Sequence, residues 1–423
     1  MAGKQYRAPR GTQDTLAAEQ PYWDLIRQTA SRLCARFGYA RIDTPVFEEA
    51  SLFTRGVGGV TDIVQKEMYV FQDRGGQELA LRPEGTAPIC RAYLEHGMHN
   101  QPQPVRLFYI APNFRYDRPQ AGRYRQHHQF GAEAIGEADA SVDGEIIELL
   151  WRLYEELGLV DLTLNLNSIG DQNCRPAYLE VLRAYYADEL DRVCDDCRAR
   201  YDRNPLRLLD CKQERCQPVI AGAPAMTDQL CAACARHFDD LRSYLDAVGI
   251  PFALNPRLVR GLDYYTRTVF EVEPRKEGRQ SSIGGGGRYD GLMELLGGPP
   301  TPGIGFGTGI ERIVINMKRQ EVPAPVAESV RVYIAVQTAE ARVRAFQLAS
   351  ELRRGGIPAQ AGAVGRSLKS QMRHADGLGA EYVAIIGERE LREDSVTLKR
   401  LATGEQEMVT VADVAGRFTA SSR

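Results

Sequence analysis

The sequence predicts an α+β protein whose main domain is a mostly antiparallel sheet flanked by helices, with a helical insertion and a small α/β domain after it. Three observations support this prediction. A long helical pattern is followed by many strand-type segments without regular strand–helix alternation. A cysteine-containing stretch with helical periodicity interrupts them, and beyond a proline-rich stretch strands and helices alternate regularly. The 423 residues suit two or three domains.

The N-terminal part begins with an amphipathic helix over 19–37. Its apolar residues fall on one stripe of period 3.6, and Gly38 follows at the position after a helix that favours glycine. The next segment, 39–47, is strand-like but contains Pro45, which cannot donate a ladder hydrogen bond. We therefore expect an edge strand or a bulge there. Such an edge beside a long helix suits a dimer interface, and it suits an ordinary edge strand equally well.

The remaining elements follow from hydrophobic periodicity. A second clear helix covers 143–158, where apolar residues share one face and Gly158 closes it. Strands are expected over 67–71, 79–82, 105–112, 113–115, 129–135, 268–273 and 280–283, the last followed by a glycine-rich turn. After 330 the pattern alternates β-α-β-α-β, with strands at 330–336, 359–361 and 382–386 and helices near 339–354 and 368–379.

These elements divide the chain into five parts. Residues 1–171 and 251–321 form the N-terminal and C-terminal parts of the sheet domain, and 172–250 form the helical insertion with its cysteines. Residues 322–329 are a proline-containing linker, and 330–423 form the α/β domain.

Composition restricts the class of protein. Hydrophobic residues make up 43% and charged residues 26%, as in globular proteins. The N-terminus has no apolar signal region, and no apolar run reaches the roughly 18 residues that a membrane span needs. Nine cysteines fit a reducing compartment, so we expect a cytoplasmic protein without a membrane partner. The net charge of −3 means that any polyanion must be held by local clusters of cations.

One such cluster lies in residues 114–129, a strand–loop–strand pattern around Pro119 and Gly122. It holds four arginines and two histidines against one acid. Arginines on such a hairpin can grip phosphates with paired N–H donors, and its aromatic residues can stack on bases. A solvated basic hairpin is the alternative.

A second pattern, residues 301–313, alternates glycines and then enters a helix with Glu311 and Arg312. Alternating glycines let a backbone or a flat ligand lie close to a strand. The chain has no GxxxxGK[ST] loop, and the pattern lacks the spacing of a dinucleotide-binding fingerprint. A glycine-rich strand packed under a helix is the alternative.

Taken together, these segments resemble the three motifs of class II aminoacyl-tRNA synthetases, in the family's order. They are a helix leading to a strand with Pro45, a Phe-Arg-x-acid hairpin at Phe114–Asp117, and a glycine-rich strand leading to Glu311-Arg312. The class I signatures HIGH and KMSKS are absent from the sequence. Residues 258–265 (LVRGLDYY), 284–291 (GGGGRYDG) and 81–87 (LRPEGTA) resemble segments of histidyl-tRNA synthetases. The resemblance runs from Arg10 to the end of the chain and implies a class II catalytic core with a C-terminal anticodon-binding domain.

The resemblance implies a binding site for L-histidine. Glu84, Gly85 and Thr86 correspond to the segment that receives the ammonium group. Glu133 and Tyr264 correspond to groups that face the imidazole, and Gln129 to a residue that holds the amino-acid backbone. Arg260 and Tyr265 complete this set. A buried pocket that bonds both ring nitrogens rejects isosteres lacking them, because its own polar groups would be left unpaired. For Glu84, an acid at a helix N-terminus is the alternative.

The resemblance also implies an ATP site, in which the histidine carboxylate attacks the α-phosphate. Arg115 is similar to the hairpin arginine that grips the α-phosphate, and Arg312 to the one that reaches the γ-phosphate; Glu311 belongs to the same site. Arg260 stands where other class II enzymes place a metal ion, and an always-charged guanidinium suits that role. Asp117 departs from the family, which commonly has glutamate there. Mg²⁺ is expected on the ATP phosphates. Catalysis is assigned to Arg260 and Arg115.

The implied macromolecular partner is tRNA(His), bound by a homodimer. The hairpin tip, with Gln120, Arg123 and Arg125, corresponds to the part that reads the acceptor end. Residues 353–373 carry five cations and no acid, which suits a phosphate backbone, and the family uses this domain for the anticodon. A solvated helix face is the alternative.

The insertion contains a metal-type pattern. Cys194-x-x-Cys197 and Cys231-x-x-Cys234 predict a structural Zn²⁺ held by the two pairs, although the 33 residues between them exceed the usual gap. Free cysteines are the alternative.

Three other functions stay open at this level. The first is a regulatory subunit of histidine biosynthesis, disfavoured by the presence of Arg115, Arg260 and Arg312 and of residues 330–423. The second is a non-catalytic tRNA- or histidine-binding sensor, which would not need an ATP site. The third is a class II enzyme for another amino acid, which the segment 258–265 disfavours.

Overall fold

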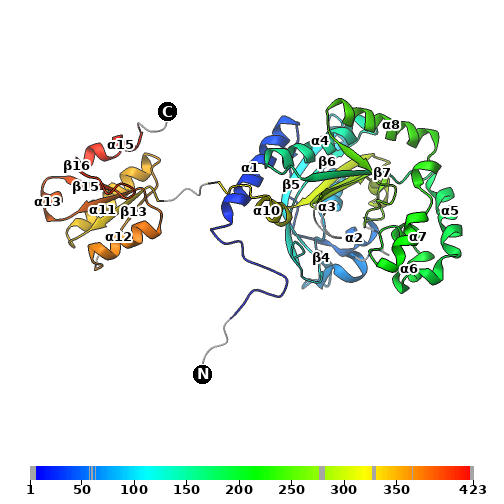
Figure 1. The fold of residues 1–423 in the computed structure, drawn as a ribbon, viewed down its shortest axis with the longest axis horizontal. Helices are drawn as coiled ribbons and strands as arrows, with labels where there is room; N and C mark the ends of the chain where they lie inside the picture. Colours follow the sequence, from blue (N-terminus) through cyan, green and yellow to red (C-terminus); the bar gives the residue numbers. More distant parts are fainter. Residues whose placement is uncertain are drawn as a thin grey trace, which may run out of the picture. The chain divides into compact units, whose positions relative to one another are not determined.

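In the computed structural model the chain forms two compact units, residues 1–325 and 326–423 (Figure 1). The structure describes residues 6–419 except 57, 59, 60, 62, 276–281, 326–329 and 364. The last four residues of the predicted linker 322–329 therefore lie outside the described residues. Within the described part, no helix combines the length and the apolar character that a bilayer crossing requires.

The first unit is built on an eight-stranded sheet in the order β1-β5-β6-β11-β10-β9-β7-β8. Neighbouring strands run antiparallel except the two outer pairs, β1–β5 and β7–β8, which are parallel. The predicted mostly antiparallel sheet is thus confirmed. Its strands are β1 (Ala40–Arg41), β5 (Val105–Phe114), β6 (Gln126–Ile135), β7 (Leu162–Ser168), β8 (Phe252–Leu254), β9 (Thr266–Pro274), β10 (Gly284–Arg288) and β11 (Gly303–Gly309).

Two cores cover the two faces of this sheet. Side chains of a strand alternate between faces, so Phe108 packs in one core and Tyr109 in the other. The first core receives the predicted amphipathic helices α1 (Gln20–Arg36) and α4 (Ala140–Glu156), together with α10 (Ile310–Arg319). The second receives α3 (Thr86–Glu95) and most of the insertion, whereas Phe238, Leu241 and Leu245 of the insertion pack in the first. Figure 1 shows these helices lying on opposite sides of the sheet.

A small three-stranded sheet lies beside the second core. It consists of β2 (Phe47–Glu49), β4 (Glu78–Leu81) and β3 (Tyr69–Gln72), and it is accompanied by α2 (Ala50–Gly56), a π-helix (Ile63–Glu67), a 3-10 turn (Met98–Asn100) and α9 (Leu292–Leu295). The single strand predicted over 39–47 is wrong. Pro45 ends pairing, so β1 and β2 join different sheets, each at an edge. The strand predicted from 67 begins at Tyr69, because the π-helix ends at Glu67.

The glycine-rich run 284–287, predicted as a turn, is part of the buried central strand β10, and that prediction is wrong. A Cβ at Gly286 would lie 1.9 Å from the carbonyl oxygen of Gly305 on β11. Glycine is used here for close packing between strands, not for turning. Residues 280 and 281 of the strand predicted just before it lie outside the described residues.

The insertion is helical, as predicted, and most of its helices are short. They are α5 (Arg175–Ala187), α6 (Asp195–Tyr201), α7 (Gln217–Gly222) and α8 (Ala232–Ala247), with 3-10 turns at Leu190–Arg192, Pro205–Leu208, Glu214–Cys216 and Met226–Gln229. Only α5 and α8 exceed three turns. The middle of the insertion therefore depends on contacts other than helix propensity.

The second unit has a five-stranded sheet, β13-β12-β14-β15-β16. The predicted β-α-β-α-β order gives the parallel part, namely β12 (Val332–Val336), α11 (Ala341–Arg354), β13 (Ala359–Ala361), α12 (Leu368–Gly377) and β14 (Tyr382–Ile386). Two antiparallel strands and three short helices, which were not predicted, complete it: α13 (Glu388–Arg392), β15 (Ser395–Arg400), β16 (Gln406–Thr410), α14 (Val411–Val414) and α15 (Gly416–Thr419).

Candidate active site

Two glycines of β11 allow long polar side chains of β6 to lie across it. Gly305 pairs with Glu133 and Gly307 with Gly131, next to Gln129. A Cβ at Gly305 would lie 1.7 Å from Oε2 of Glu133, and one at Gly307 would lie 1.9 Å from Nε2 of Gln129. No side chain larger than hydrogen fits at either place. The glycine-rich strand thus forms the base on which two predicted histidine-binding side chains lie.

Glu133 is completely buried and receives two hydroxyl groups. Thr86 Oγ1 donates to its Oε1 at 2.7 Å, and Tyr289 OH donates to its Oε2 at 2.7 Å. Burial and, less strongly, the charge of Glu84 raise the pKa of Glu133 to about 8, although the two hydroxyl bonds act in the opposite direction. At neutral pH this carboxyl is therefore largely protonated. A cation bound nearby would lower its pKa and favour loss of the proton.

Glu84 lies at the start of α3 and bonds its backbone. Its Oε2 accepts from Thr86 N at 2.7 Å and its Oε1 accepts from Ala87 N at 2.9 Å. Burial raises the pKa of Glu84, while these bonds and the charge of Arg115 lower it. The helix N-terminal role, left open by the sequence, is thus present. It also orients a second buried carboxylate close to Glu133.

Tyr109 passes between two glycines to reach Gln129. A Cβ at Gly85 or Gly131 would lie within 2.5 Å of the Tyr109 ring. Its hydroxyl donates to Gln129 Oε1 at 3.1 Å, and Asn113 Nδ2 donates to the same oxygen at 2.6 Å. The amide of Gln129 is therefore held in one orientation with its NH₂ group over Gly307.

Tyr264 and Tyr265 form an aromatic wall. Both are buried, and their ring centroids lie 4.8 Å apart. The Tyr264 ring also meets Tyr289 edge-on at 5.9 Å. Burial raises the pKa of Tyr264 well above its ordinary value, so its hydroxyl stays a neutral donor and acceptor. This wall excludes water beside the two carboxyl groups.

The three arginines assigned to the triphosphate lie around this pocket. Arg115 Nε donates to the carbonyl oxygen of Pro83 at 2.7 Å, next to Glu84. Arg312 Nε donates to the carbonyl oxygen of Gly122 in the hairpin at 2.9 Å. Arg260 NH1 pairs with Glu271 Oε1 at 3.1 Å and lies beside Gly285, where a Cβ would be 3.0 Å away.

These arginines are linked through shared charged neighbours. Burial lowers the pKa of Arg312, the positive charges of Arg123 and Arg115 lower it further, and Glu271 opposes them. Glu271 is also the ion-pair partner of Arg260. Among the described residues, the buried Nε of Arg260 has no hydrogen-bond partner. This arrangement favours a polyanionic ligand. Such a ligand would neutralise the clustered positive charges and accept a hydrogen bond from the unpaired N–H group.

The loop between β5 and β6 carries the predicted acceptor-end residues. A two-residue bridge pairs Gln120 with Arg123 at its tip. Arg123 NH1 lies 3.8 Å from Asp117 Oδ1, and the Arg125 guanidinium lies 3.7 Å above the ring of Tyr116. Asp117 thus faces a hairpin arginine, in keeping with the short reach of aspartate. Gln120 and Tyr116 are exposed, as a nucleic-acid contact would require.

Glu311 is engaged elsewhere in the structure. Its two oxygens accept from His128 N at 2.8 and 3.0 Å, and its Oε1 lies 3.0 Å from Nδ1 of the same histidine. This carboxylate ties the start of α10 to β6. The structure therefore gives Glu311 a structural contact, and the ATP contact expected for it stays a prediction.

The cysteines predicted as one zinc site fall into two groups. Cys194 and Cys197 lie with Cys211 and Cys216, whereas Cys231 and Cys234 lie with Asp171 and Cys174. The predicted ligand set of two CxxC pairs is therefore wrong. The reason is topological: α6 and α8, which carry the two pairs, come together with different neighbouring segments.

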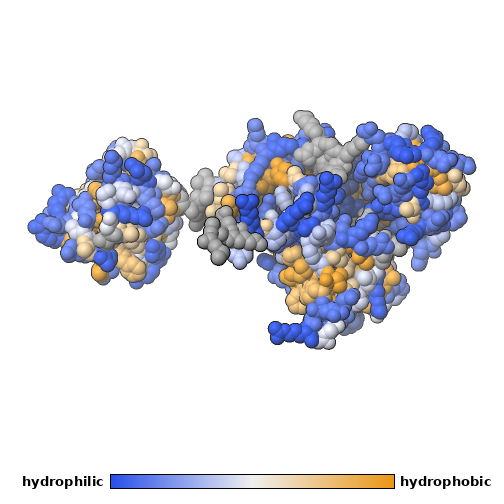
Figure 2. Space-filling model, turned by 90° about the horizontal axis from the view of Figure 1, so that it is seen from below, coloured by the Kyte–Doolittle hydropathy of each residue, from blue (hydrophilic) through white to orange (hydrophobic). Residues whose placement is uncertain are grey.

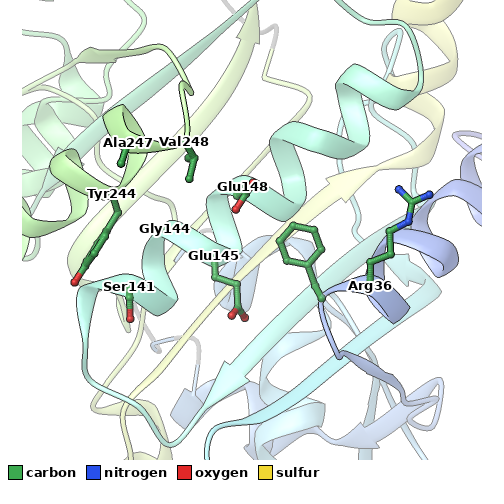
Figure 3. Close-up of a pocket in the computed structure, with 9 residues that line it drawn as sticks. Arg36, Ser141, Gly144, Glu145, Glu148, Tyr244, Ala247 and Val248 are labelled. Atoms are coloured by element: carbon green, nitrogen blue, oxygen red, sulfur yellow. The ribbon is translucent and has the colours of Figure 1, made fainter.

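A separate hollow lies on the outer surface of the first core, between α1, α4 and α8 (Figure 3). Its lining includes Glu145 and Glu148 of α4 and Arg36 of α1. Glu145 is already bonded to Tyr39 and, through both oxygens, to Arg106. This acidic hollow contains none of the predicted site residues and is unsuited to a triphosphate.

The second unit exposes the predicted basic stretch. All five cations of 353–373 are exposed to solvent: Arg353, Arg354, Arg366, Lys369 and Arg373. They lie at the end of α11, in the loop after β13 and on α12. This surface can contact a phosphate backbone without desolvating buried groups.

Comparison with known proteins identifies the relatives of this chain. The family model described as histidyl-tRNA synthetase matches residues 11–313, and the model described as anticodon binding domain matches residues 329–420. The chain belongs to the histidyl-tRNA synthetase family. It is 57% identical over 401 residues to the histidine–tRNA ligase of Dehalococcoides mccartyi strain 195, covering 95% of this chain and 96% of the relative.

Other members of the histidyl-tRNA synthetase family are similar over nearly the whole length. The histidine–tRNA ligase of Desulforamulus reducens is 48% identical, with 96% of this chain and 97% of the relative covered. The crystal structure of the apo Staphylococcus aureus histidyl-tRNA synthetase superposes with a TM-score of 0.83 at 37% identity, covering 98% of this chain and all of the other. The class II fold expected from the resemblance is thereby confirmed.

Three side chains of this family member's site were not assigned from the sequence. Tyr289 binds Glu133, Glu271 pairs with Arg260, and Tyr109 orients Gln129. Tyr289 lies inside the GGGGRYDG segment, and the resemblance of that segment to the family could have identified Tyr289 as a site residue. Glu271 and Tyr109 look like ordinary strand residues, and only sheet register brings them to the pocket.

Proposed function

We propose that the chain is a histidine–tRNA ligase. It activates L-histidine with ATP to histidyl-adenylate and pyrophosphate, and then transfers histidine to the 3′ end of tRNA(His). The main supporting observation is that the buried Glu133, bonded to Thr86 and Tyr289, lies near Glu84, which in turn is influenced by the charge of Arg115. The buried carboxyl groups suit an amino acid with ring nitrogens, and the arginines suit the triphosphate of a nucleotide. The family membership of the chain supports the same function.

In the first step a carboxylate oxygen of histidine attacks the α-phosphorus, the bond from that phosphorus to the bridging oxygen breaks, and pyrophosphate leaves. Arg115 and Arg260 are the catalytic residues in this proposal, since charge grows on the phosphate oxygens as attack proceeds. Arg312 binds the γ-phosphate, and Asp117 lies at the edge of the ATP site. Mg²⁺ would neutralise phosphate charge on ATP when bound.

The amino acid is oriented by groups that already hold one another in place. Glu84 and the backbone of Gly85 and Thr86 face its ammonium group, and Gln129 holds its backbone. Glu133 and Tyr264 face the imidazole, with Tyr265 closing the wall. Because these groups are packed and hydrogen-bonded, little reorganisation is needed when the substrate enters.

In the second step a ribose hydroxyl of the terminal adenosine attacks the carbonyl carbon of the adenylate, and AMP leaves. We propose that Gln120, Arg123 and Arg125 contact the acceptor end, and that the basic stretch 353–373 contacts the anticodon arm. In the same proposal, 1–171 and 251–321 make the catalytic domain, 172–250 the insertion and 330–423 the anticodon-binding domain. The Zn²⁺ expected in the insertion takes no part in either step.

The protein is proposed to act as a homodimer in the cytoplasm. Support comes from the edge strand β1 and from the small sheet, where Val46, Phe47, Val70 and Phe71 each expose 40% or more of their surface. Figure 2, which views the first unit from below Figure 1, shows apolar surface on this face, the side on which β4 lies in Figure 1. Clustered exposed apolar side chains favour burial against another chain.

The decisive experiment is exchange of labelled pyrophosphate into ATP. We expect exchange that depends on histidine and is absent with threonine, proline or glycine. Exchange with one of those amino acids in place of histidine would overturn the assigned specificity. No exchange with any amino acid, while histidine or tRNA still binds, would favour a regulatory or sensor protein instead.

A further inference from the structure

Four cysteine sulfurs meet inside the insertion, and they come from three different short segments. Cys194 precedes α6 and Cys197 lies in its first turn, Cys211 follows the 3-10 turn Pro205–Leu208, and Cys216 ends the turn before α7. Their four Sγ atoms all lie within 4.8 Å of one another. Cys197, Cys211 and Cys216 are buried, and Cys194 is partly so.

The spacing of these sulfurs fits one tetrahedral ion. A Zn–S bond of about 2.3 Å places the sulfurs of a tetrahedral zinc site about 3.8 Å apart. The sulfurs of Cys194 and Cys211 are 3.7 Å apart, and those of Cys197 and Cys216 are 4.0 Å apart. A disulfide needs about 2.05 Å, and all four cysteines are free thiols. An iron–sulfur cluster would hold its thiolates around several irons and so spread them further.

The immediate surroundings also suit metal-bound thiolates. The backbone N–H of Cys194 donates to Sγ of Cys216 at 3.2 Å. A backbone donor of this kind orients a metal-binding sulfur and shares its negative charge. Thiolates are soft ligands, and four of them in tetrahedral array select Zn²⁺.

From this geometry we propose that Cys194, Cys197, Cys211 and Cys216 bind one structural Zn²⁺. Helices of six and seven residues, such as α7 and α6, are too short to be stable alone, and much of this region is 3-10 turn. A single ion linking three segments supplies the missing stabilisation, as in other small metal-stapled folds.

The other group, Asp171 with Cys174, Cys231 and Cys234, is not the site we propose. Asp171 Oδ1 accepts from Asn173 N at 2.9 Å, and its Oδ2 pairs with Arg267 at 3.2 Å. Both oxygens of this carboxylate therefore already have partners. The group serves as a matched control, because it too contains a CxxC pair in the same insertion.

The metal site also supports the segment that carries Arg260. The consequence for catalysis rests on the proposed function, in which Arg260 is catalytic. Between Cys197 and Cys211 the chain carries Asn204, whose Nδ2 donates to Asp263 Oδ1 at 2.8 Å. Arg207 of the same stretch lies beside Gly261, where a Cβ would be 3.3 Å from its NH1. Gly261 and Asp263 both lie within the segment from Arg260 to Tyr264. Arg260 is the catalytic residue there, and the zinc ligands position its segment.

The first test is metal analysis of the full chain purified without chelator. We expect about one equivalent of zinc per chain, falling below about a tenth in Cys197→Ser and Cys216→Ser. Cys231→Ser and Cys234→Ser should keep the metal. Wild-type protein with under about a tenth of an equivalent after growth with added zinc, or metal lost only from the Cys231 and Cys234 variants, would overturn the site.

A second measurement on wild-type protein holds even if those variants fail to fold. Replacing zinc with Co²⁺ should give the visible d–d bands of a tetrahedral ion together with sulfur-to-cobalt charge transfer. An octahedral spectrum without charge transfer would overturn the tetrathiolate assignment. Removing the metal should lower the melting temperature and reduce histidine-dependent pyrophosphate exchange. Because metal content and spectrum are read without activity, failure of the ligase proposal would leave this result unaffected.

Discussion

Gly305 provides a sharp test of how the histidine pocket is built. An added methyl group at this position would lie 1.7 Å from Glu133 Oε2 and 2.7 Å from the carbonyl oxygen of Ala132. Ordinary contact begins at 3.4 Å, so the Glu133 carboxylate must move by about 1.7 Å in Gly305→Ala. That movement breaks the 2.7 Å bonds from Thr86 and Tyr289.

The expected cost follows from this displacement. A misplacement of about 1 Å in a positioned group can cost roughly 10²-fold in rate. A buried polar group that loses its hydrogen-bond partner costs about 1–3 kcal/mol, which corresponds to about 5- to 150-fold. We therefore expect kcat/KM for histidine in pyrophosphate exchange to fall at least about 100-fold, with a much smaller change in the KM for ATP.

Gly291→Ala is the matched control, because an added methyl group there would have no heavy atom within 4 Å. It should retain activity within about twofold of wild type. Circular dichroism and melting curves of both variants would separate local from global damage. If folded Gly305→Ala kept wild-type kcat/KM for histidine, Glu133 would not be the group that faces the substrate.

Two further predictions concern the same site. Arg260→His should abolish exchange while the fold is retained, because imidazole lacks the permanent charge and multiple donors of guanidinium; near-normal exchange in that variant would refute the catalytic role. The pKa of about 8 for Glu133 predicts that histidine binding at about pH 5, where the imidazole of free histidine is a cation, releases a proton to the buffer. Calorimetry in buffers of different ionisation enthalpy measures this release, and Glu133→Gln should remove it. The raised pKa also means that the stability contributed by Glu133 is present below its unfolded value of about 4.5 and is lost as pH rises through about 8. The melting temperature of ligand-free protein should therefore fall over that window, and less so in Glu133→Gln.

Much of the fold could be read from the sequence, because helical and strand periodicities are local properties. The helices at 19–37 and 143–158 appear as α1 and α4, and the alternation after residue 330 appears as the parallel part of the second sheet. The strand through Pro45 and the turn at 284–287 were wrong. Both errors concern pairing partners, which a local pattern does not specify.

The site shows the same division. Glu84, Thr86 and Arg115 lie in segments with a recognisable pattern, so the sequence alone was enough to predict them as site residues. Glu271 and Tyr109 could not be found in this way, because nothing in their neighbourhood distinguishes them from other strand residues. Their roles arise from register, which places each beside a side chain far along the chain.

The cysteines show most clearly what each level decides. By itself the sequence determined that two CxxC pairs with metal-binding spacing lie in the insertion, since CxxC spacing is a local property. Only the tertiary structure decided which cysteines lie together, and it grouped Cys211 and Cys216 with the first pair. The physical reason is that metal coordination and pocket geometry depend on distances between segments, and those distances are set by packing and strand register.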